Sequence, residues 1–342
     1  MCLLWTKLIV CALVIILSGY KITKYGSVIA NITGIGGLWI GTMILAAITS
    51  LPEVVASISS VILVKSPDLA LGNVLGSNLF NLTIIVFMDF IYKKKPLLGE
   101  VKERHILPLG FGMLLASVVA FSLMTNFLIK ISKSSFSLPV ISHVGVDSLL
   151  LVLIYIISVK LIFNFEHQHN IETEDSSLKN NNLIKNILLF SLFSVIIVIS
   201  SIFLTKLADE VAYATNLGHT LVGSTLLAIT TSLPEIVVSI SAVRMGEIDI
   251  GLGNALGSNV SNMTIIFLSD LFYYQGSIFS SVNSSHILTA ICQIIMYCVV
   301  LISIIYKPAN YKPTKRFLNL GWGSILILAL YLLSIITLYK IK

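Results

Sequence analysis

Two copies of one acidic motif contain the residues of this sequence that could do chemistry. The sequence Thr-Ser-Leu-Pro-Glu occurs at residues 49–53 and again at residues 231–235, each time inside a long apolar run. Each copy is followed by Gly-Asn-x-x-Gly-Ser-Asn-x-x-Asn, at residues 72–81 and 253–262. A charged residue at the centre of a membrane helix costs about 2.5–3.5 kcal/mol on insertion scales. A carboxylate in each copy therefore points to a cation held between the two copies.

The first copy can present several oxygen atoms on one helical turn. Pro52 has no N–H, so the carbonyl of Ile48 loses its helical partner and nearby carbonyls become available to a cation. Thr49 and Ser50 lie four and three residues before Glu53 and so share its face of the helix. Carboxylate, hydroxyl and carbonyl oxygens together suit hard cations such as Ca²⁺ or Na⁺.

The glycine- and asparagine-rich motif adds a second polar face. Ser77 and Asn81 are four residues apart and lie on one side of a helix. Gly72 and Gly76 have the small-residue spacing that lets two helix backbones approach closely. The second half of the chain repeats the pattern with Thr231, Ser232, Glu235, Ser258 and Asn262, and with the glycine pair Gly253 and Gly257.

The charges in the paired motifs favour a divalent cation. Two carboxylates, Glu53 and Glu235, balance one Ca²⁺, although with help from hydroxyl and carbonyl oxygens they could instead hold two or more Na⁺. Neither motif contains His or Cys, which disfavours Zn²⁺ and other soft metals. No nucleophile or cofactor motif accompanies the carboxylates, so we expect no cofactor and no enzymatic activity.

Composition places the motifs in a membrane protein. The chain has 342 residues, of which 56% are hydrophobic and 11% charged, whereas a soluble domain carries about 25% charged residues. The net charge is +6, but no run mixes dense Lys and Arg with aromatic residues, so we expect no nucleic-acid partner. The expected surroundings of this chain are a lipid bilayer.

Apolar runs predict ten membrane-spanning helices. They lie at residues 3–29, 37–64, 69–92, 106–131, 140–165, 184–216, 220–245, 250–274, 286–306 and 318–338. A polar break is expected in the first of them, near residues 21–24. The two motifs fall in the second and third helices of each half of the chain.

An internal repeat divides the chain into two halves. Residues 41–85 align with residues 223–266, and each half carries five of the predicted helices. Because five is odd, the second half enters the membrane from the opposite side, and such inverted repeats place a substrate near the midplane. We therefore predict an all-α membrane protein with an N-terminal half at 1–165, a linker at 166–183 and a C-terminal half at 184–342.

The charge of the loops predicts the orientation of the chain. Most basic residues, Lys93–Lys95 and Arg104 among them, lie in loops on one side of the predicted membrane. The positive-inside rule puts that side in the cytoplasm, together with the polar linker, and puts both termini outside. In the linker, His167 and His169 could bind a regulatory metal, but a solvated linker is the simpler interpretation.

The two motif pairs resemble the alpha repeats of the cation/calcium exchanger superfamily, specifically its sodium/calcium exchanger branch. The likeness covers the ten-helix layout, and its specificity lies in residues 41–85 and 223–266. It implies antiport, in which Na⁺ runs down its gradient while Ca²⁺ leaves through the same site. It also implies a set of ligands or near-ligands. These are Glu53, Glu235, Thr49, Thr231, Ser50, Ser232, Ser77, Ser258, Asn81 and Asn262, with the carbonyls of Ala46 and Ala228 at the sodium sites.

The chain departs from this family pattern at two places. Ile48 and Thr230 stand where many relatives have a glycine before the acidic motif, so local unwinding of the helix is less free. Asn262 stands where potassium-dependent relatives carry Asp, which suggests no K⁺ requirement. The linker at 166–183 is also too short for a regulatory domain, and the chain looks like a minimal, prokaryote-style exchanger.

The family likeness implies alternating access in the cell membrane with one chain as the transport unit. The second, third, seventh and eighth predicted helices would form a fixed core, and the first and sixth would move across it. A proton/calcium antiporter is the nearest alternative, although such relatives usually vary the Thr-Ser-Leu-Pro-Glu element. A cation channel is a further alternative, but channels usually build their filter from symmetric subunits. An intramembrane enzyme would use Glu53 and Glu235 as an acid/base pair.

Overall fold

The computed structural model describes residues 2–92, 95–133, 138–170, 183–214, 230–306 and 320–341. Within these ranges the chain is helical apart from turns and one short hairpin. The long helices are α1 (Cys2–Thr33), α5 (Pro67–Ile91), α7 (Ile106–Ser132), α8 (Val146–Asn170), α9 (Leu183–Ala214), α12 (Ile248–Phe272), α14 (Ser285–Ile305) and α15 (Trp322–Ile341). The shorter ones are α2 (Gly37–Trp39), η1 (Ile40–Leu45), α3 (Ala46–Thr49), α4 (Leu51–Ile62), α6 (Leu97–Glu100), η2 (Glu103–His105), α11 (Leu233–Met245) and α13 (Ile278–Ser281).

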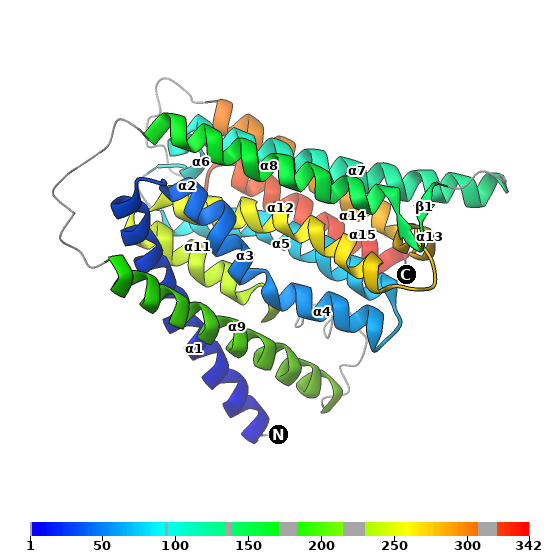
Figure 1. Ribbon diagram of the computed structural model, residues 1–342, viewed down its shortest axis with the longest axis horizontal. Helices are drawn as coiled ribbons and strands as arrows, with labels where there is room; N and C mark the ends of the chain where they lie inside the picture. Colours follow the sequence, from blue (N-terminus) through cyan, green and yellow to red (C-terminus); the bar gives the residue numbers. More distant parts are fainter. Residues whose placement is uncertain are drawn as a thin grey trace.

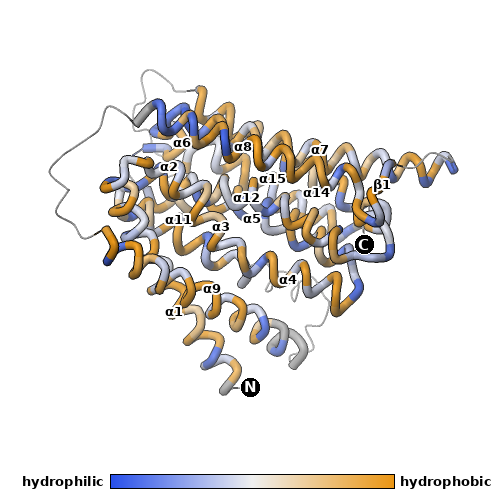
Figure 2. The backbone as a smooth tube through the Cα atoms, in the orientation of Figure 1, coloured by the Kyte–Doolittle hydropathy of each residue, from blue (hydrophilic) through white to orange (hydrophobic). Residues whose placement is uncertain are grey.

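Eight helical segments in the described ranges are long and apolar enough to cross a membrane. They are Leu4–Thr33, Gly37–Ile62, Pro67–Ile91, Glu103–Ser132, Val146–Gln168, Leu183–Ala208, Ser285–Ile305 and Trp322–Lys340. Apolar residues dominate the tube along these segments, and hydrophilic residues gather near the helix ends (Figure 2). Large apolar side chains also face outwards, such as Leu17 at 66% and Phe121 at 71% exposure. The chain is therefore an integral, multi-pass membrane protein.

Two of the ten predicted spans are not among these eight segments. One coincides with a helix of lower hydropathy, and the other with a helix that the structure describes only in part. Helix α12 occupies the place of the eighth span, and its polar motif lowers its hydropathy. Helix α11 occupies the C-terminal part of the seventh, whose first residues, 220–229, lie outside the described ranges.

Two details of the predicted boundaries are wrong. Helix α1 is continuous across Lys21 and Lys24, because lysine is a good helix former and does not remove a backbone hydrogen bond. Helix α8 begins at Val146, because the preceding residues form a hairpin of β1 (Val140–Ile141) and β2 (Val144–Gly145).

The two acidic motifs interrupt their helices at equivalent serines. Ser50 separates α3 from α4 with φ −82° and ψ −2°, and Ser232 precedes α11 with φ −88° and ψ 8°. In each copy the proline two residues later cannot donate the N–H that would continue the helical ladder. The break expected from Pro52 is thus present at the same place in both copies.

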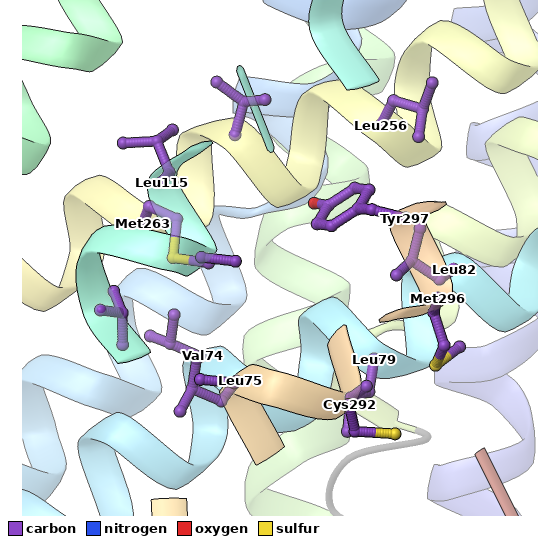
Figure 3. Close-up of a cluster of buried hydrophobic side chains, with 14 of the residues drawn as sticks. Val74, Leu75, Leu79, Leu82, Leu115, Leu256, Met263, Cys292, Met296 and Tyr297 are labelled. Atoms are coloured by element: carbon purple, nitrogen blue, oxygen red, sulfur yellow. The ribbon is translucent and has the colours of Figure 1, made fainter. Parts of the chain in front are cut away.

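The motif helices α5 and α12 lie side by side in the middle of the molecule (Figure 1). Helices α1 and α9 pack against each other at one flank, and α7 and α8 lie at the opposite flank. One buried apolar cluster joins α5, α7, α12, α14 and α15, and Figure 3 shows part of it. A second cluster joins α1 and α9 to η1 and α11. The first cluster makes one packed body of the helices that carry the glycine- and asparagine-rich motifs.

The glycines of α12 allow its backbone to touch that of the broken helix. A Cβ on Gly253 would lie 3.0 Å from the carbonyl oxygen of Leu38, and a Cβ on Gly257 would overlap the main chain of Thr42. This confirms the close approach predicted for the second glycine pair. In the first pair, a Cβ on Gly76 would meet no atom within 4 Å among the described residues.

Asp89, late in α5, ties together three segments of the fold. Its Oδ1 accepts the backbone N–H of Leu97 at 2.7 Å. Its Oδ2 accepts the N–H of Gly321 and the hydroxyl of Ser324, each at 2.7 Å. The carboxylate thereby holds α6 and the start of α15 against the end of α5.

Asp270 makes the same connections at the end of α12. Its Oδ1 accepts the N–H of Ile278 at 2.7 Å, and its Oδ2 accepts the N–H of Gly145 at 2.8 Å and the hydroxyl of Ser148. Asp89 and Asp270 therefore tie helices together in the same way, through hydrogen bonds to segments outside the acidic motifs.

Two histidine–aspartate pairs join the halves of the chain. Nε2 of His105 lies 2.9 Å from Asp249, and Nε2 of His286 lies 3.1 Å from Asp68. Each pair combines a histidine at the start of one helix with an aspartate at the start of a helix from the other half. Arg104 reinforces the first pair by binding Asp249 as well.

Candidate ion-binding site

Glu53 is held in the first turn of α4 and receives side chains from both motif copies. Its Oε1 lies 3.5 Å from the hydroxyl of Ser77 on α5 and 3.4 Å from the hydroxyl of Ser232, just before α11. Thr231 also faces this carboxylate. Glu53 is fully buried. These long hydrogen bonds therefore lie in a region without bulk water.

Glu235 occupies the equivalent place in the first turn of α11. It is fully buried and faces Glu53 and the side chain of Thr49. Neither carboxylate oxygen of Glu235 has a hydrogen-bond partner among the described residues. Two buried carboxylates from two motif copies thus face each other with little compensation from the protein.

Thr49 connects the end of α3 to the polar face of α12. Its Oγ1 lies 3.3 Å from each of three oxygens, the carbonyl of Ala46, the amide of Asn254 and the hydroxyl of Ser258. The carbonyl of Ala46 also accepts the N–H of Ser50 at 3.0 Å. Asn254 was not among the predicted ligands, although its place in the repeated motif was visible in the sequence.

An asparagine from each glycine-rich motif supports the turn that carries each glutamate. Nδ2 of Asn73 lies 3.3 Å from the carbonyl oxygen of Glu53, and Nδ2 of Asn254 lies 3.4 Å from that of Glu235. Because the same bond forms in both copies, each glutamate backbone is fixed relative to the helix that brings the serine and asparagine ligand candidates.

A second pair of asparagines links the two copies to each other. Nδ2 of Asn78 donates to the carbonyl of Asn259 at 3.3 Å, and Nδ2 of Asn259 donates to the carbonyl of Asn78 at 3.0 Å. Nδ2 of Asn262 then donates to the side-chain oxygen of Asn78 at 3.0 Å. The side chain of Asn81 has no partner among the described residues.

The structure brings together most of the predicted ligands. The residues that contact one another around the two carboxylates are Glu53, Glu235, Thr49, Thr231, Ser232, Ser77 and Ser258. Ser50, Asn81 and Asn262 are buried nearby, but within the described part of the chain they make no hydrogen bond to either carboxylate. Ala46 connects to this group through Thr49, and Ala228 lies outside the described residues.

Several buried oxygen atoms of this group have no hydrogen-bond partner among the described residues. They are Oγ of Ser50, Oε2 of Glu53, Oδ1 of Asn81, both carboxylate oxygens of Glu235 and Oδ1 of Asn262. An unsatisfied buried polar atom costs about 1–3 kcal/mol, and more when it is charged. A cation offsets several such costs at once, and hard cations prefer oxygen ligands of these types. The described residues include no cluster of three or more His, Cys, Asp and Glu side chains suited to a softer metal.

Comparison with known proteins identifies the family. Residues 3–164 and 185–340 match the family described as "Sodium/calcium exchanger protein". The chain therefore belongs to the sodium/calcium exchanger protein family, a class of membrane antiporters.

Individual relatives agree with this membership. The chain is 31% identical to inner membrane protein YrbG of Escherichia coli K12 over 264 residues, which is 76% of each protein. It is 27% identical to sodium/calcium exchanger MaX1 of Methanosarcina acetivorans over 278 residues, 73% of this chain and 77% of that one. Among solved structures, the fold is similar to that of the sodium-calcium exchanger NCX_Mj, with a TM-score of 0.72 at 19% identity and 98% coverage of both chains.

Proposed function

We propose that this protein is a Na⁺/Ca²⁺ antiporter whose ions bind between the two motif copies. The observation that carries this proposal is the pair of buried carboxylates, Glu53 and Glu235, whose oxygens lack sufficient partners in the described protein. Ca²⁺ takes about 6–8 oxygen ligands and would balance both charges. The same oxygens would bind Na⁺ after Ca²⁺ has left the site. The name of the relative MaX1 supports Na⁺ rather than H⁺ as the driving ion.

The ligands of our proposal are those predicted from the motifs. Glu53 and Glu235 supply the charge, and hydroxyls and amides complete the oxygen shell. These additional ligands are Thr49, Thr231, Ser50, Ser232, Ser77, Ser258, Asn81 and Asn262, with the carbonyls of Ala46 and Ala228. No resident cofactor takes part, because the cations are the substrates.

The proposed architecture is ten spans in two inverted halves, 1–165 and 184–342, joined by the linker 166–183. The equivalent connections of Asp89 and Asp270 support it, because each ends the third helix of its half and ties down the next short helix. Both termini would lie outside the cytoplasm, and one chain would form the transport unit because it contains both motif copies.

We propose that α1 and α9 move together across the rest of the molecule to expose the site to each side. These two helices pack against each other along their length (Figure 1). Polar contacts between described residues connect α1 to α11 and to the residue before α12. Ser27 donates to Glu247 at 2.5 Å, and the hydroxyl of Thr23 lies 3.4 Å from the carbonyl of Val238. The proposed movement would have to break both of these contacts.

The test is ⁴⁵Ca²⁺ uptake into proteoliposomes loaded with Na⁺. We expect uptake that requires internal Na⁺, ignores a pH gradient and disappears in Glu53→Gln and in Glu235→Gln. Glu100→Gln is the matched control, because this partly exposed carboxylate pairs with Lys95 at 3.1 Å, away from the two acidic motifs. It should keep normal uptake.

Two other outcomes would contradict the proposal in different ways. Uptake driven by a proton gradient alone would make the protein a proton/calcium antiporter. Flux that needs no counter-ion and survives both glutamate substitutions would favour a channel.

A further inference from the structure

The last asparagine of the second glycine-rich motif is held through its amide nitrogen. Nδ2 of Asn262 donates to the side-chain oxygen of Asn78 at 3.0 Å, and both side chains are fully buried. Asn262 lies one helical turn after Ser258, whose hydroxyl is 3.3 Å from Thr49, so it shares the face of α12 that meets the first acidic motif. The side-chain oxygen of Asn262 has no hydrogen-bond partner among the described residues.

A backbone carbonyl determines which way both amides are turned. Nδ2 of Asn78 donates to the carbonyl oxygen of Asn259 at 3.3 Å. A carbonyl oxygen only accepts hydrogen bonds, so the N–H₂ group of Asn78 must face it and the side-chain oxygen of Asn78 must point away from it. That oxygen in turn can only bind a donor, which fixes the N–H₂ group of Asn262. The oxygen of Asn262 is therefore the end of the amide that is left for an ion.

The first motif has the same backbone link but does not hold its last asparagine in this way. Nδ2 of Asn259 donates to the carbonyl oxygen of Asn78 at 3.0 Å. The equivalent side-chain bond would run from Nδ2 of Asn81 to the side-chain oxygen of Asn259. This bond is absent, since neither atom has a partner among the described residues. The two motifs thus differ in how they hold the amide of the last asparagine.

We propose that Asn78 is a positioning residue that makes Asn262 present its oxygen to the bound cation. The N–H₂ group of Asn262 carries a partial positive charge, and it cannot turn towards the cation without losing its bond to Asn78. The orientation is therefore fixed before the ion arrives, which lowers the entropy cost of binding. The inference rests on the proposed function, since it requires Asn262 to be a ligand, and it adds a residue outside the proposed ligand set.

The test measures the Ca²⁺ concentration for half-maximal exchange in proteoliposomes, separately from the maximum rate. Asn78→Leu removes the acceptor at similar size, so Asn262 can then turn either end of its amide to the ion. We expect the half-maximal concentration to rise about three- to tenfold, which corresponds to the loss of one hydrogen bond. Asn78→Ala removes the same acceptor with a smaller side chain and should shift the concentration in the same range, so the test does not depend on one variant folding.

Asn259→Leu is the matched variant for a purely structural role. Like Asn78→Leu, it loses one bond to the carbonyl of the opposite asparagine, but it releases no amide of the ligand set. Both variants should unfold at a lower temperature in detergent. The shift in Ca²⁺ concentration should be larger in Asn78→Leu than in Asn259→Leu by about threefold or more. Equal shifts would mean that Asn78 only links the two copies, and would overturn the positioning role.

A background without the amide makes the mechanism specific. In Asn262→Asp both ends of the side-chain group are oxygens, so its orientation no longer matters. Adding Asn78→Leu to Asn262→Asp should therefore not raise the Ca²⁺ concentration for half-maximal exchange. A rise as large as in the wild-type background would contradict the inference, because Asn78 would then act on the site by another route.

Ca²⁺-dependent thermal unfolding separates this inference from the proposed function. Ca²⁺ should raise the unfolding temperature of the wild-type protein, and Asn78→Leu should need more Ca²⁺ for the same rise, by the factor found in exchange. A wild-type Ca²⁺ requirement in Asn78→Leu overturns the inference alone. No Ca²⁺ response in the wild type overturns the proposed Ca²⁺ site and the inference with it.

Discussion

At the scale of single residues, the buried carboxylates of Asp89 and Asp270 hold segments of the fold together. The buried carboxylates of Glu53 and Glu235 are the ones that we propose bind ions. Each carboxylate accepts three hydrogen bonds from neighbouring segments. Glu235 accepts no hydrogen bond in the described protein, and Glu53 accepts long ones, at 3.4–3.5 Å through Oε1, while its Oε2 has no partner. The protein itself thus satisfies the carboxylates of Asp89 and Asp270. The carboxylates of Glu53 and Glu235 keep oxygens that suit a transported cation.

Substituting either aspartate should therefore destabilise the protein without changing ion selectivity. In Asp89→Asn or Asp270→Asn one oxygen becomes an N–H₂ group that faces a donor. The lost bonds to charge are worth about 1.5–3 kcal/mol each, so the unfolding temperature in detergent should fall. Glu103→Gln, an exposed carboxylate of η2, is the control and should unfold normally. A variant that unfolds normally but loses Ca²⁺ dependence would refute this structural role.

The sequence could identify the ligand candidates but not the residues that position them. Glu53 and Glu235 are evident because a carboxylate in an apolar run is rare and its neighbourhood repeats. The equivalence of Asp89 and Asp270 was also visible, because each lies late in the helix that carries a glycine- and asparagine-rich motif. Their partners were not, because backbone N–H groups carry no sequence signal.

At the scale of elements, the close contact between α12 and η1 decides how the site is assembled. The contact requires glycine at position 257, where a Cβ would overlap the backbone of Thr42. It places Ser258 at 3.3 Å from Thr49. The sequence predicted this approach from glycine spacing, but the π-helical turn of η1 that meets it has no comparable signature.

Gly257→Ala should consequently push α12 away from η1 and disturb the site. Overpacking of this kind typically costs about 1–3 kcal/mol. We expect a lower unfolding temperature and weaker Ca²⁺-dependent exchange. Gly110→Ala in α7 is the matched control, because a Cβ there meets no atom within 4 Å among the described residues. If Gly257→Ala exchanges and unfolds like Gly110→Ala, the contact does not hold the site together.

At the scale of the whole molecule, the movement proposed for α1 and α9 can be tested by crosslinking. The side chains of Ser27 and Glu247 meet at 2.5 Å between α1 and the loop before α12. Cysteines at these two positions, in a background without the four native cysteines, should be bridged by Hg²⁺. The bridge should stop exchange, and an excess of thiol should restore it.

A bridge within the moving pair provides the control. Tyr25 on α1 and Phe193 on α9 stack with ring centroids 6.0 Å apart. Cysteines at these positions should be bridged without loss of exchange, because the two helices would move together. If both bridges stop exchange, α1 and α9 move relative to each other; if neither does, α1 does not slide over α12.

The reciprocal bonds between Asn78 and Asn259 have a consequence for how such a chain could arise. Each residue meets its own counterpart, which is the property of an isologous interface between two copies of one subunit. A single five-helix ancestor inserted into the membrane in both orientations would make this contact with itself. Joining two copies in one gene would then preserve the interface while each copy became free to diverge.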